Sequence, residues 1–168
     1  MSNTQSIRIS GITPESIVDG EGIRYVIFTQ GCPHHCPGCH NPSTHSFDGG
    51  KLVSLIDLVN DIRKNAEYID GITLSGGEPF CQPHQCSIIA REAQKLGLSV
   101  WCYTGYSFEN LIEKKDASTL LNFVDVLVDG LFIFEERSLD LDFRGSKNQR
   151  LIDVRTSLEK GVTTLKHY

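Results

Sequence analysis

Short apolar runs alternate along the chain with stretches whose apolar residues recur every three or four positions. The alternating segment from Ile7 to Ile12 and the apolar run from Arg24 to Thr29 predict two strands. Between them, the proline and glycine residues from Thr13 to Gly22 predict a loop. Further strands are predicted where apolar runs return, at residues 71–75, 98–103 and 124–129.

Three amphipathic segments between these strands have the spacing of helices. Gly97 is expected to end the second helix, and Ser107 to cap the start of the third. The predicted buried faces are Leu52, Leu55, Ile56, Val59 and Ile62 in the first, Cys86, Ile89, Ala90, Ala93 and Leu96 in the second, and Phe108, Leu111 and Ile112 in the third. Strands that alternate with helices predict right-handed βαβ units around a parallel sheet. Since a complete eight-stranded barrel takes roughly 250 residues, this α/β chain predicts an open parallel sheet or partial (β/α) barrel with flanking helices.

Length and composition narrow the classes of protein to consider. The chain has 168 residues, of which 39% are hydrophobic, and this favours a single domain over residues 1–168. A net charge of -5 provides no basic surface for nucleic acid and no polybasic membrane anchor. No stretch approaches the roughly 20 apolar residues that span a bilayer, and the chain does not begin with the apolar core of a signal peptide. We therefore expect a soluble, cytoplasmic protein.

The residues with the clearest chemistry lie directly after the strand that ends at Thr29. Cys32, Cys36 and Cys39 form a C-x3-C-x2-C pattern, and prolines and a glycine between them stiffen the loop. Structural metal sites close all four positions with protein ligands, so three thiolates without a fourth favour a reactive centre. We therefore expect a 4Fe-4S cluster with one iron open to another ligand.

Two other interpretations of this loop remain open. Structural zinc would take a nearby histidine (His34, His35, His40 or His45) as its fourth ligand, although zinc sites usually combine two separated ligand pairs. An iron-sulfur electron carrier would need protein ligands on every iron. Disulfides are disfavoured because the six cysteines are unevenly spaced and too sparse for a small secreted scaffold.

A second motif follows the strand predicted at residues 71–75. Gly76 and Gly77 let the backbone approach a ligand closely, with carbonyls available to a protonated amine, and Pro79 holds Glu78 extended. Alone, the two glycines would equally suit an ordinary tight turn. In a parallel sheet, however, this turn and the cysteine loop lie at the same edge, where ligands gather.

Together, the cysteine loop and Gly76-Gly77-Glu78 resemble the signature of the radical S-adenosylmethionine superfamily. The resemblance implies a partial (β/α) barrel in which S-adenosyl-L-methionine chelates the open iron of the 4Fe-4S cluster. The chemistry would take place at the cluster, without a side-chain acid or base. The implied cluster ligands are Cys32, Cys36 and Cys39, and the implied cofactor contacts are Gly38, Cys39, His40, Gly76, Gly77 and Glu78. Gly38 departs from the family, because many members have an aromatic residue there, and this leaves the packing against the adenine open.

Further segments are similar to the glycyl-radical enzyme activases of this superfamily. Residues 18–24 resemble their V-D-G-P-G-x-R segment, with Glu21 in place of proline, and residues 101–106, 126–130 and 144–150 are also similar. The resemblance implies an oxidoreductase that cleaves S-adenosylmethionine and removes a Cα hydrogen from a glycine of a partner. The implied partner is an anaerobic ribonucleoside-triphosphate reductase, because the chain has no room for the ferredoxin-like domain of other activases. A flavodoxin-like or other one-electron donor is implied, together with a homodimer or a complex with the reductase.

Two alternatives within the superfamily stay open. One is activation of another glycyl-radical enzyme, and the other is small-molecule chemistry of the 7-carboxy-7-deazaguanine synthase type.

The remaining residues suggest further roles. Beyond Gly130 the alternating pattern weakens, and we expect either a lid or docking segment or a tail packed on one sheet edge. Asp19, Arg24 and residues 144–150 are candidates for the docking face. Cys86 and Cys102 are expected to pack in the core, and the same plain expectation holds for Cys81, with a redox role as its alternative.

Overall fold

The sheet that the sequence predicts is present in the computed structural model, which describes residues 5–168. Its strands lie in the order β3-β1-β2-β4-β5-β6-β7. β2, β4, β5 and β6 run parallel, whereas β1 and β3 pair antiparallel at one edge and β7 at the other. The strands are β1 (Ser6–Ser16), β2 (Arg24–Thr29), β3 (Lys51–Ser54), β4 (Gly71–Gly76), β5 (Ser99–Tyr103), β6 (Val126–Asp129) and β7 (Arg150–Asp153).

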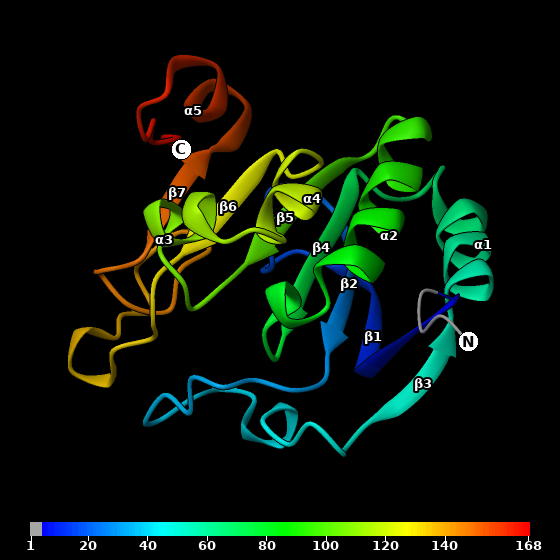
Figure 1. Cartoon of the computed structure of the whole chain (residues 1–168), viewed down its shortest axis with the longest axis horizontal. Coiled ribbons are helices and arrows are strands. Elements are labelled where there is room, and N and C mark those ends of the chain that lie inside the picture. The colour runs from blue at the N-terminus through cyan, green and yellow to red at the C-terminus, as the bar shows by residue number, and fades with distance from the viewer. Residues whose placement is uncertain (1–4) are drawn as a thin grey trace.

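Helices cover one face of this sheet (Figure 1). The α-helices are α1 (Leu55–Asn65), α2 (Pro83–Lys95), α3 (Phe108–Glu113), α4 (Ala117–Leu121) and α5 (Val154–Lys160), with 3-10 turns at Pro42–Thr44, Pro79–Cys81 and Phe134–Glu136. Because side chains alternate along a strand, the sheet has two apolar faces. The larger packs against the helices and includes Ile72 and Leu74, and the smaller contains Trp101, Val126 and Val128. No helix within residues 5–168 is long and apolar enough to cross a membrane.

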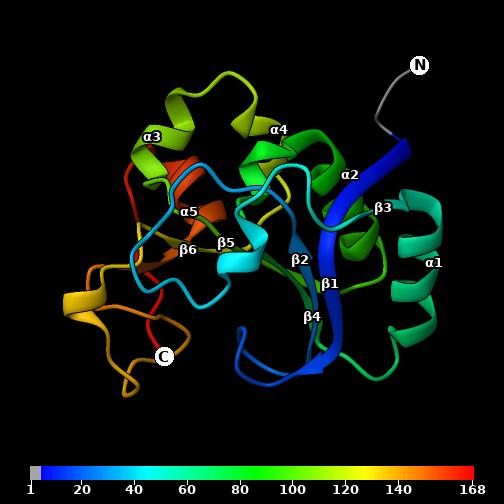
Figure 2. The same ribbon diagram turned by 90° about the horizontal axis from the view of Figure 1, so that it is seen from below.

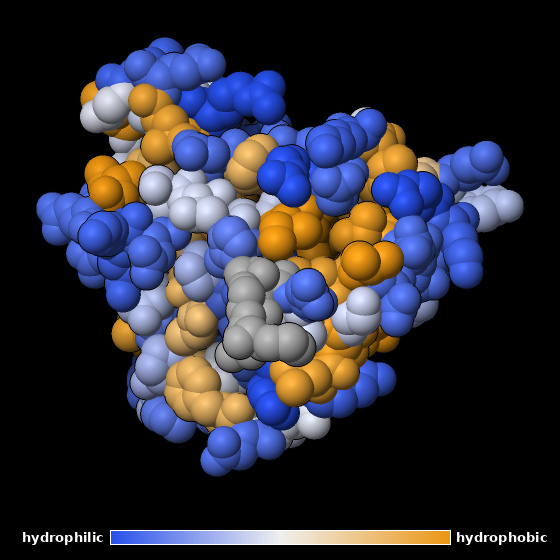
Figure 3. All heavy atoms as spheres, turned by 45° about the vertical axis from the view of Figure 1, so that its right-hand side comes forward, coloured by the Kyte–Doolittle hydropathy of each residue, from blue (hydrophilic) through white to orange (hydrophobic). Residues whose placement is uncertain are grey.

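Two expectations about the first third of the chain are wrong. β1 continues through Ser16, well into the loop that the sequence predicts. Leu52 belongs to β3, which pairs with β1, and the helix begins only after Ser54, whose side chain caps it. Leu52 is therefore exposed, and Ile56 within α1 is exposed as well, rather than buried as predicted. The α1 side of the molecule accordingly has apolar side chains at its surface (Figure 3).

The third predicted helix is only partly correct. Ser107 caps α3 as expected, because its hydroxyl accepts a hydrogen bond from the Asn110 amide. Phe108 and Leu111 are buried, but Ile112 is 54% exposed. The reason is that α3 ends at Glu113, and the core contacts that a longer helix would make come from α4 instead.

The chain beyond Gly130 contains elements that the sequence does not reveal. β7 pairs antiparallel with β6, with Ile152 opposite Leu127, and α5 follows with Asp153 as its N-cap. The alternative of a segment packed on one sheet edge is therefore confirmed for β7.

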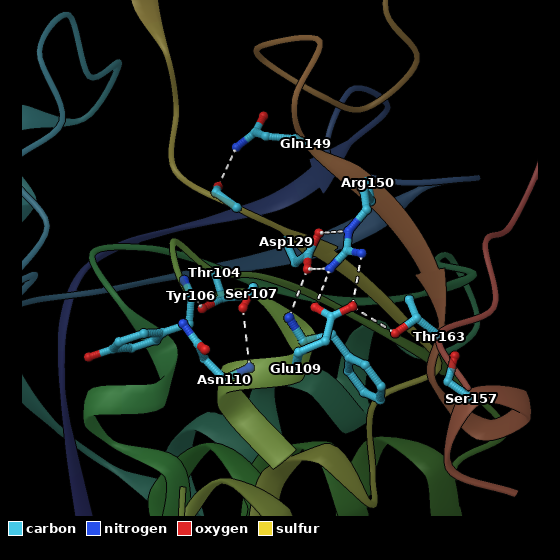
Figure 4. Close-up of polar contacts among 12 residues, drawn as sticks. Thr104, Tyr106, Ser107, Glu109, Asn110, Asp129, Gln149, Arg150, Ser157 and Thr163 are labelled. Atoms are coloured by element: carbon cyan, nitrogen blue, oxygen red, sulfur yellow. Dashed lines mark hydrogen bonds and ion pairs between the residues drawn. The ribbon is translucent and has the colours of Figure 1, made fainter. Parts of the chain in front are cut away.

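A network of charged side chains fastens β7 to the parallel part of the sheet (Figure 4). Arg150 binds Asp129 through Nε at 3.0 Å and a terminal nitrogen at 2.5 Å, and it also binds both oxygens of Glu109 at 3.0 and 2.7 Å. The Asp129 side chain is 2% exposed and also accepts the Phe108 amide at 2.8 Å. Thr163 donates to Glu109 at 2.9 Å. The network thus joins the end of β6, the start of α3, the start of β7 and the C-terminal segment.

We predict that Glu109→Gln makes the stability less dependent on acid pH. The hydrogen bonds from Arg150 lower the pKa of Glu109 from 4.5 to about 2, so its contribution is complete above pH 4.5 and is lost as the pH falls toward 2. Half of this side chain is exposed, and because solvent screens the ion pair we expect a loss of about 1 kcal/mol at pH 7. Urea unfolding followed through Trp101 fluorescence measures the difference between variant and wild type. The difference should shrink between pH 5 and pH 3, and a constant difference would contradict the prediction.

Candidate metal centre

The predicted motifs lie together at the carboxyl ends of the parallel strands. The cysteine loop follows β2, the Gly76-Gly77-Glu78 turn follows β4, and Thr104 and Gly105 follow β5. The β2–β4 register places Thr29 beside Gly76, so the first two motifs leave the sheet at the same level. Seen from below, the loop after β2 lies in front of the sheet and next to the segment after β6 (Figure 2). The sequence argument that brought these motifs to one edge is confirmed.

The neck of the cysteine loop is fixed by hydrogen bonds between its two arms. The Gly31 amide donates to the Thr44 carbonyl at 2.7 Å, and the Cys32 amide donates to the His45 carbonyl at 3.1 Å. The Gln30 side chain, which is 3% exposed, adds bonds to the carbonyls of Ser43 and Ser46. The loop therefore begins and ends at defined points although it carries little regular structure.

The tip of the loop turns tightly between its second and third cysteines. The Cys39 amide donates to the Cys36 carbonyl at 3.1 Å, and Gly38 adopts a φ of 74°. A Cβ atom on Gly38 would lie 2.5 Å from Cδ2 of Phe134, and Phe132 packs on His40 with ring centroids 5.0 Å apart. Gly38 is thus required both by its backbone conformation and by the aromatic ring above it.

The thiols are free and differ in environment. Cys32 is buried, whereas Cys36 and Cys39 are partly exposed. Burial raises the pKa of the Cys32 thiol, and the nearby charges of Glu78 and Cys36 act in the same direction, while the amides of His34 and His35 oppose them. The Asn41 amide donates to the Cys39 sulfur at 3.4 Å. Amides directed at cysteine sulfurs are typical of iron-sulfur sites.

The three predicted cluster ligands share one loop. Among residues 5–168, no group of three His, Cys, Asp or Glu side chains is arranged to hold a metal ion. The donor set nevertheless fits an iron-sulfur cluster, because three thiols stand on a loop whose neck is fixed and whose amides face sulfur. The histidines of the zinc alternative are directed elsewhere, with His34 on Glu78, His35 on His45 and His40 on Phe132. The assignment of Cys32, Cys36 and Cys39 as ligands stays a prediction.

The Gly76-Gly77 turn is pressed against the start of the cysteine loop. The Gly77 amide donates to the Thr29 carbonyl at 2.8 Å, and the Glu78 amide donates to the Gly31 carbonyl at 2.9 Å. A Cβ atom on Gly77 would lie 2.4 Å from the Gly31 carbonyl oxygen. Gly77 therefore permits a contact between two backbones that any side chain would prevent.

Glu78 has a structural role that its sequence motif does not reveal. Its side chain is fully buried and accepts hydrogen bonds from the Phe80 amide at 3.0 Å and the Gly105 amide at 2.9 Å. The Thr104 hydroxyl lies 2.9 Å from one carboxylate oxygen, and Nε2 of His34 lies 2.7 Å from the same oxygen. The carboxylate thus joins the cysteine loop to the ends of β4 and β5. The contact of Glu78 with the cofactor stays a prediction.

A cavity of about 760 Å³ opens beside the third cysteine. Its lining includes His40, Tyr103 and Asp19, together with the exposed side chains of Val18 and Leu139. Asp19 thus lines the same cavity as His40, and its docking role stays a prediction. The far wall comes from residues 137–145, which include Arg144 and Gly145 of the predicted docking segment. No local pattern in the sequence shows that residues 137–143 face this cavity.

Two other docking candidates prove to be engaged within the fold. Arg24 is 1% exposed and donates to Thr73, Ser99 and the Ile72 carbonyl, so the expectation that it lines a docking face is wrong. Arg150 is held by the two carboxylates shown in Figure 4. Both arginines stabilise the ends of strands rather than offer a free positive charge.

Comparisons with known proteins agree with an iron-sulfur site in this chain. Residues 18–152 match the family described as a 4Fe-4S single cluster domain. A protein of Haemophilus influenzae named anaerobic ribonucleoside-triphosphate reductase-activating protein is 34% identical over 144 residues, covering 81% of this chain and 91% of that protein. A protein of the same name from Escherichia coli K12 is 33% identical, covering 81% of this chain and 92% of that protein. Another from phage T4 is 36% identical, covering 83% of this chain and 90% of that protein. QueE from Escherichia coli aligns at a TM-score of 0.44 and 18% identity over 60% of this chain and 52% of that chain, a likeness too slight to bear on function.

We predict that Gly77→Ala strongly reduces iron binding at the cysteine loop, although the substitution adds only one methyl group. The added methyl group collides with the Gly31 carbonyl and must push the cysteine loop away from β4, at a cost of roughly 1 to 3 kcal/mol. Iron content after anaerobic reconstitution should fall well below that of the wild type. Gly11→Ala is the matched control, because a Cβ atom there meets nothing within 4 Å. Equal iron content in the two variants would contradict the prediction.

Proposed function

The chain belongs to the family of anaerobic ribonucleoside-triphosphate reductase-activating proteins, and from that membership we propose that it forms a glycyl radical in its reductase by reductive cleavage of S-adenosylmethionine. It is a radical S-adenosylmethionine oxidoreductase whose cofactors are a 4Fe-4S cluster and S-adenosyl-L-methionine. The observation that carries the proposal is the contact between the cysteine loop and the Gly76-Gly77 turn at the carboxyl ends of parallel strands.

Cys32, Cys36 and Cys39 hold the cluster in this proposal. Three ligands on one loop leave one iron for the amino and carboxylate groups of the cofactor. Gly76 and Gly77 lie directly beside the start of this loop, which supports a role in binding that amino group. The other cysteines have different environments. Cys86 and Cys102 are fully buried in the main core as expected, whereas Cys81 is exposed after the Gly-Gly-Glu turn, so the expectation that it packs in the core is wrong.

The residues of the chain bind and orient the reactants and exclude water from them. Held by Cys32, Cys36 and Cys39, the reduced cluster would supply the one electron that cleaves the S–C5' bond of the cofactor, giving methionine and a 5'-deoxyadenosyl radical that would take a Cα hydrogen from a glycine of the partner. Gly38, Cys39 and His40 form the outer side of the cofactor site, where Phe132 and Phe134 pack on the loop. Glu78 holds the inner side by its bonds to His34 and Gly105.

The proposed partner is the anaerobic ribonucleoside-triphosphate reductase, which meets the activase in a complex during radical formation. The shared name of the relatives supports this partner over the two alternatives from the sequence. A glycine within a protein needs an opening beside the cluster, and the cavity next to His40 reaches the surface at Val18 and Leu139. A flavodoxin-like protein is proposed as the one-electron donor.

We predict that replacing any one of Cys32, Cys36 or Cys39 with alanine abolishes both the cluster and the glycyl radical. Iron analysis and the absorption spectrum report the cluster after anaerobic reconstitution. Electron paramagnetic resonance reports the glycyl doublet after incubation with the reductase, S-adenosylmethionine and a reductant. Cys81→Ala is the control, and it should keep the cluster and form the radical. A variant of the three that retains a full 4Fe-4S spectrum would contradict the ligand assignment.

A further inference from the structure

His34 lies inside the cysteine loop, two residues after Cys32, yet its ring is directed away from the loop and into the protein. Nε2 lies 2.7 Å from Oε1 of Glu78, and only 12% of the His34 side chain is exposed. The Glu78 side chain is fully buried. The histidine thus reaches across the edge of the sheet to a carboxylate that belongs to the β4 turn.

The His34 ring packs closely against the residues around it. Its edge packs on Tyr106 with ring centroids 4.6 Å apart and an interplanar angle of 76°. A Cβ atom on Gly105 would lie 2.5 Å from Cδ2 of His34, so glycine leaves the space that the imidazole fills. Lys114 places its ammonium group 4.3 Å from the centroid of the Tyr106 ring. These contacts hold the imidazole in one orientation.

The energetic argument comes from the buried carboxylate. A buried carboxylate is costly unless hydrogen-bond donors surround it. The Phe80 amide, the Gly105 amide and the Thr104 hydroxyl all come from the β4 and β5 turns. Of the donors to Glu78, His34 is the one that the cysteine loop supplies. Its removal would leave the carboxylate one donor short and would release the loop from its side-chain anchor.

We infer that His34 is a positioning residue, which fixes the segment between Cys32 and Cys36 against Glu78 and thereby limits the positions that the cysteine sulfurs can take when the cluster binds. The inference rests on the ligand assignment proposed above and assigns to His34 a role separate from metal binding. The His34 and His35 amides lie near the Cys32 sulfur, so the anchored ring also fixes the backbone that faces this proposed ligand.

The test compares His34→Ala, His34→Gln and the wild type after anaerobic reconstitution. Loss of a hydrogen bond to a charged group should speed the release of iron to a chelator by about tenfold in His34→Ala. Glutamine carries a terminal amide that can donate to Glu78, so His34→Gln should restore most of the wild-type rate. The signal of the reduced cluster in electron paramagnetic resonance should broaden in the alanine variant and sharpen again in the glutamine variant.

His35→Ala is the matched control, because its exposed ring lies in the same loop but contacts His45 instead of Glu78. It should release iron at the wild-type rate. The double variant His34→Ala/Glu78→Gln should release iron no faster than the faster of the two single variants, because both changes break the same contact. Additive effects, or a His34→Ala protein with wild-type release and an unchanged signal, would overturn the inference. A wild-type protein that takes up no cluster would instead overturn the proposed function.

Discussion

The centre depends on the close approach of two backbones, the turn after β4 and the start of the cysteine loop. The amides of Gly77 and Glu78 donate to carbonyls on the β2 side, so the pairing of β2 with β4 continues beyond the strands themselves. No side chain fits at this contact, because a Cβ atom on Gly77 would lie 2.4 Å from the Gly31 carbonyl oxygen. A shift of the register that brought Glu78 to the place of Gly77 would put a side chain at this point. The position of the centre is thus set by the register of two parallel strands.

Local sequence signals were sufficient for the parallel part of the sheet and for the two motifs that it brings together. β2 has the predicted bounds because an apolar run between a glycine-rich loop and a glycine marks a buried strand clearly. The antiparallel edges were harder to predict. β3 and β7 have four residues each, and their strand conformation comes from pairing with β1 and β6 rather than from their own composition. The same pairing explains Leu52, which has the spacing of a helical residue but lies in a strand.

The details of the centre that the sequence did not predict are contacts between distant segments. The cysteine spacing predicts which residues hold a metal, but it contains no sign that His34 meets Glu78 or that Phe134 contacts Gly38. The Gly-Gly-Glu turn predicts a cofactor contact at Glu78, which stays a prediction, but it does not show that the carboxylate is buried among hydrogen-bond donors. The docking expectation for Arg24 was wrong because the sequence does not show that this basic residue is buried.

The region beyond Gly130 contacts the cysteine loop through two aromatic residues after β6, Phe132 and Phe134. Phe134 packs on Gly38, and the guanidinium of Arg137 lies 3.7 Å from the centroid of its ring. The cysteine loop is therefore held from two sides, by a buried carboxylate on the sheet side and by aromatic rings on the outer side. The residues at its tip, Pro37 and Gly38, remain exposed between these supports. In the proposed function, this exposed tip between Cys36 and Cys39 is the part of the loop that a one-electron donor approaches from solvent.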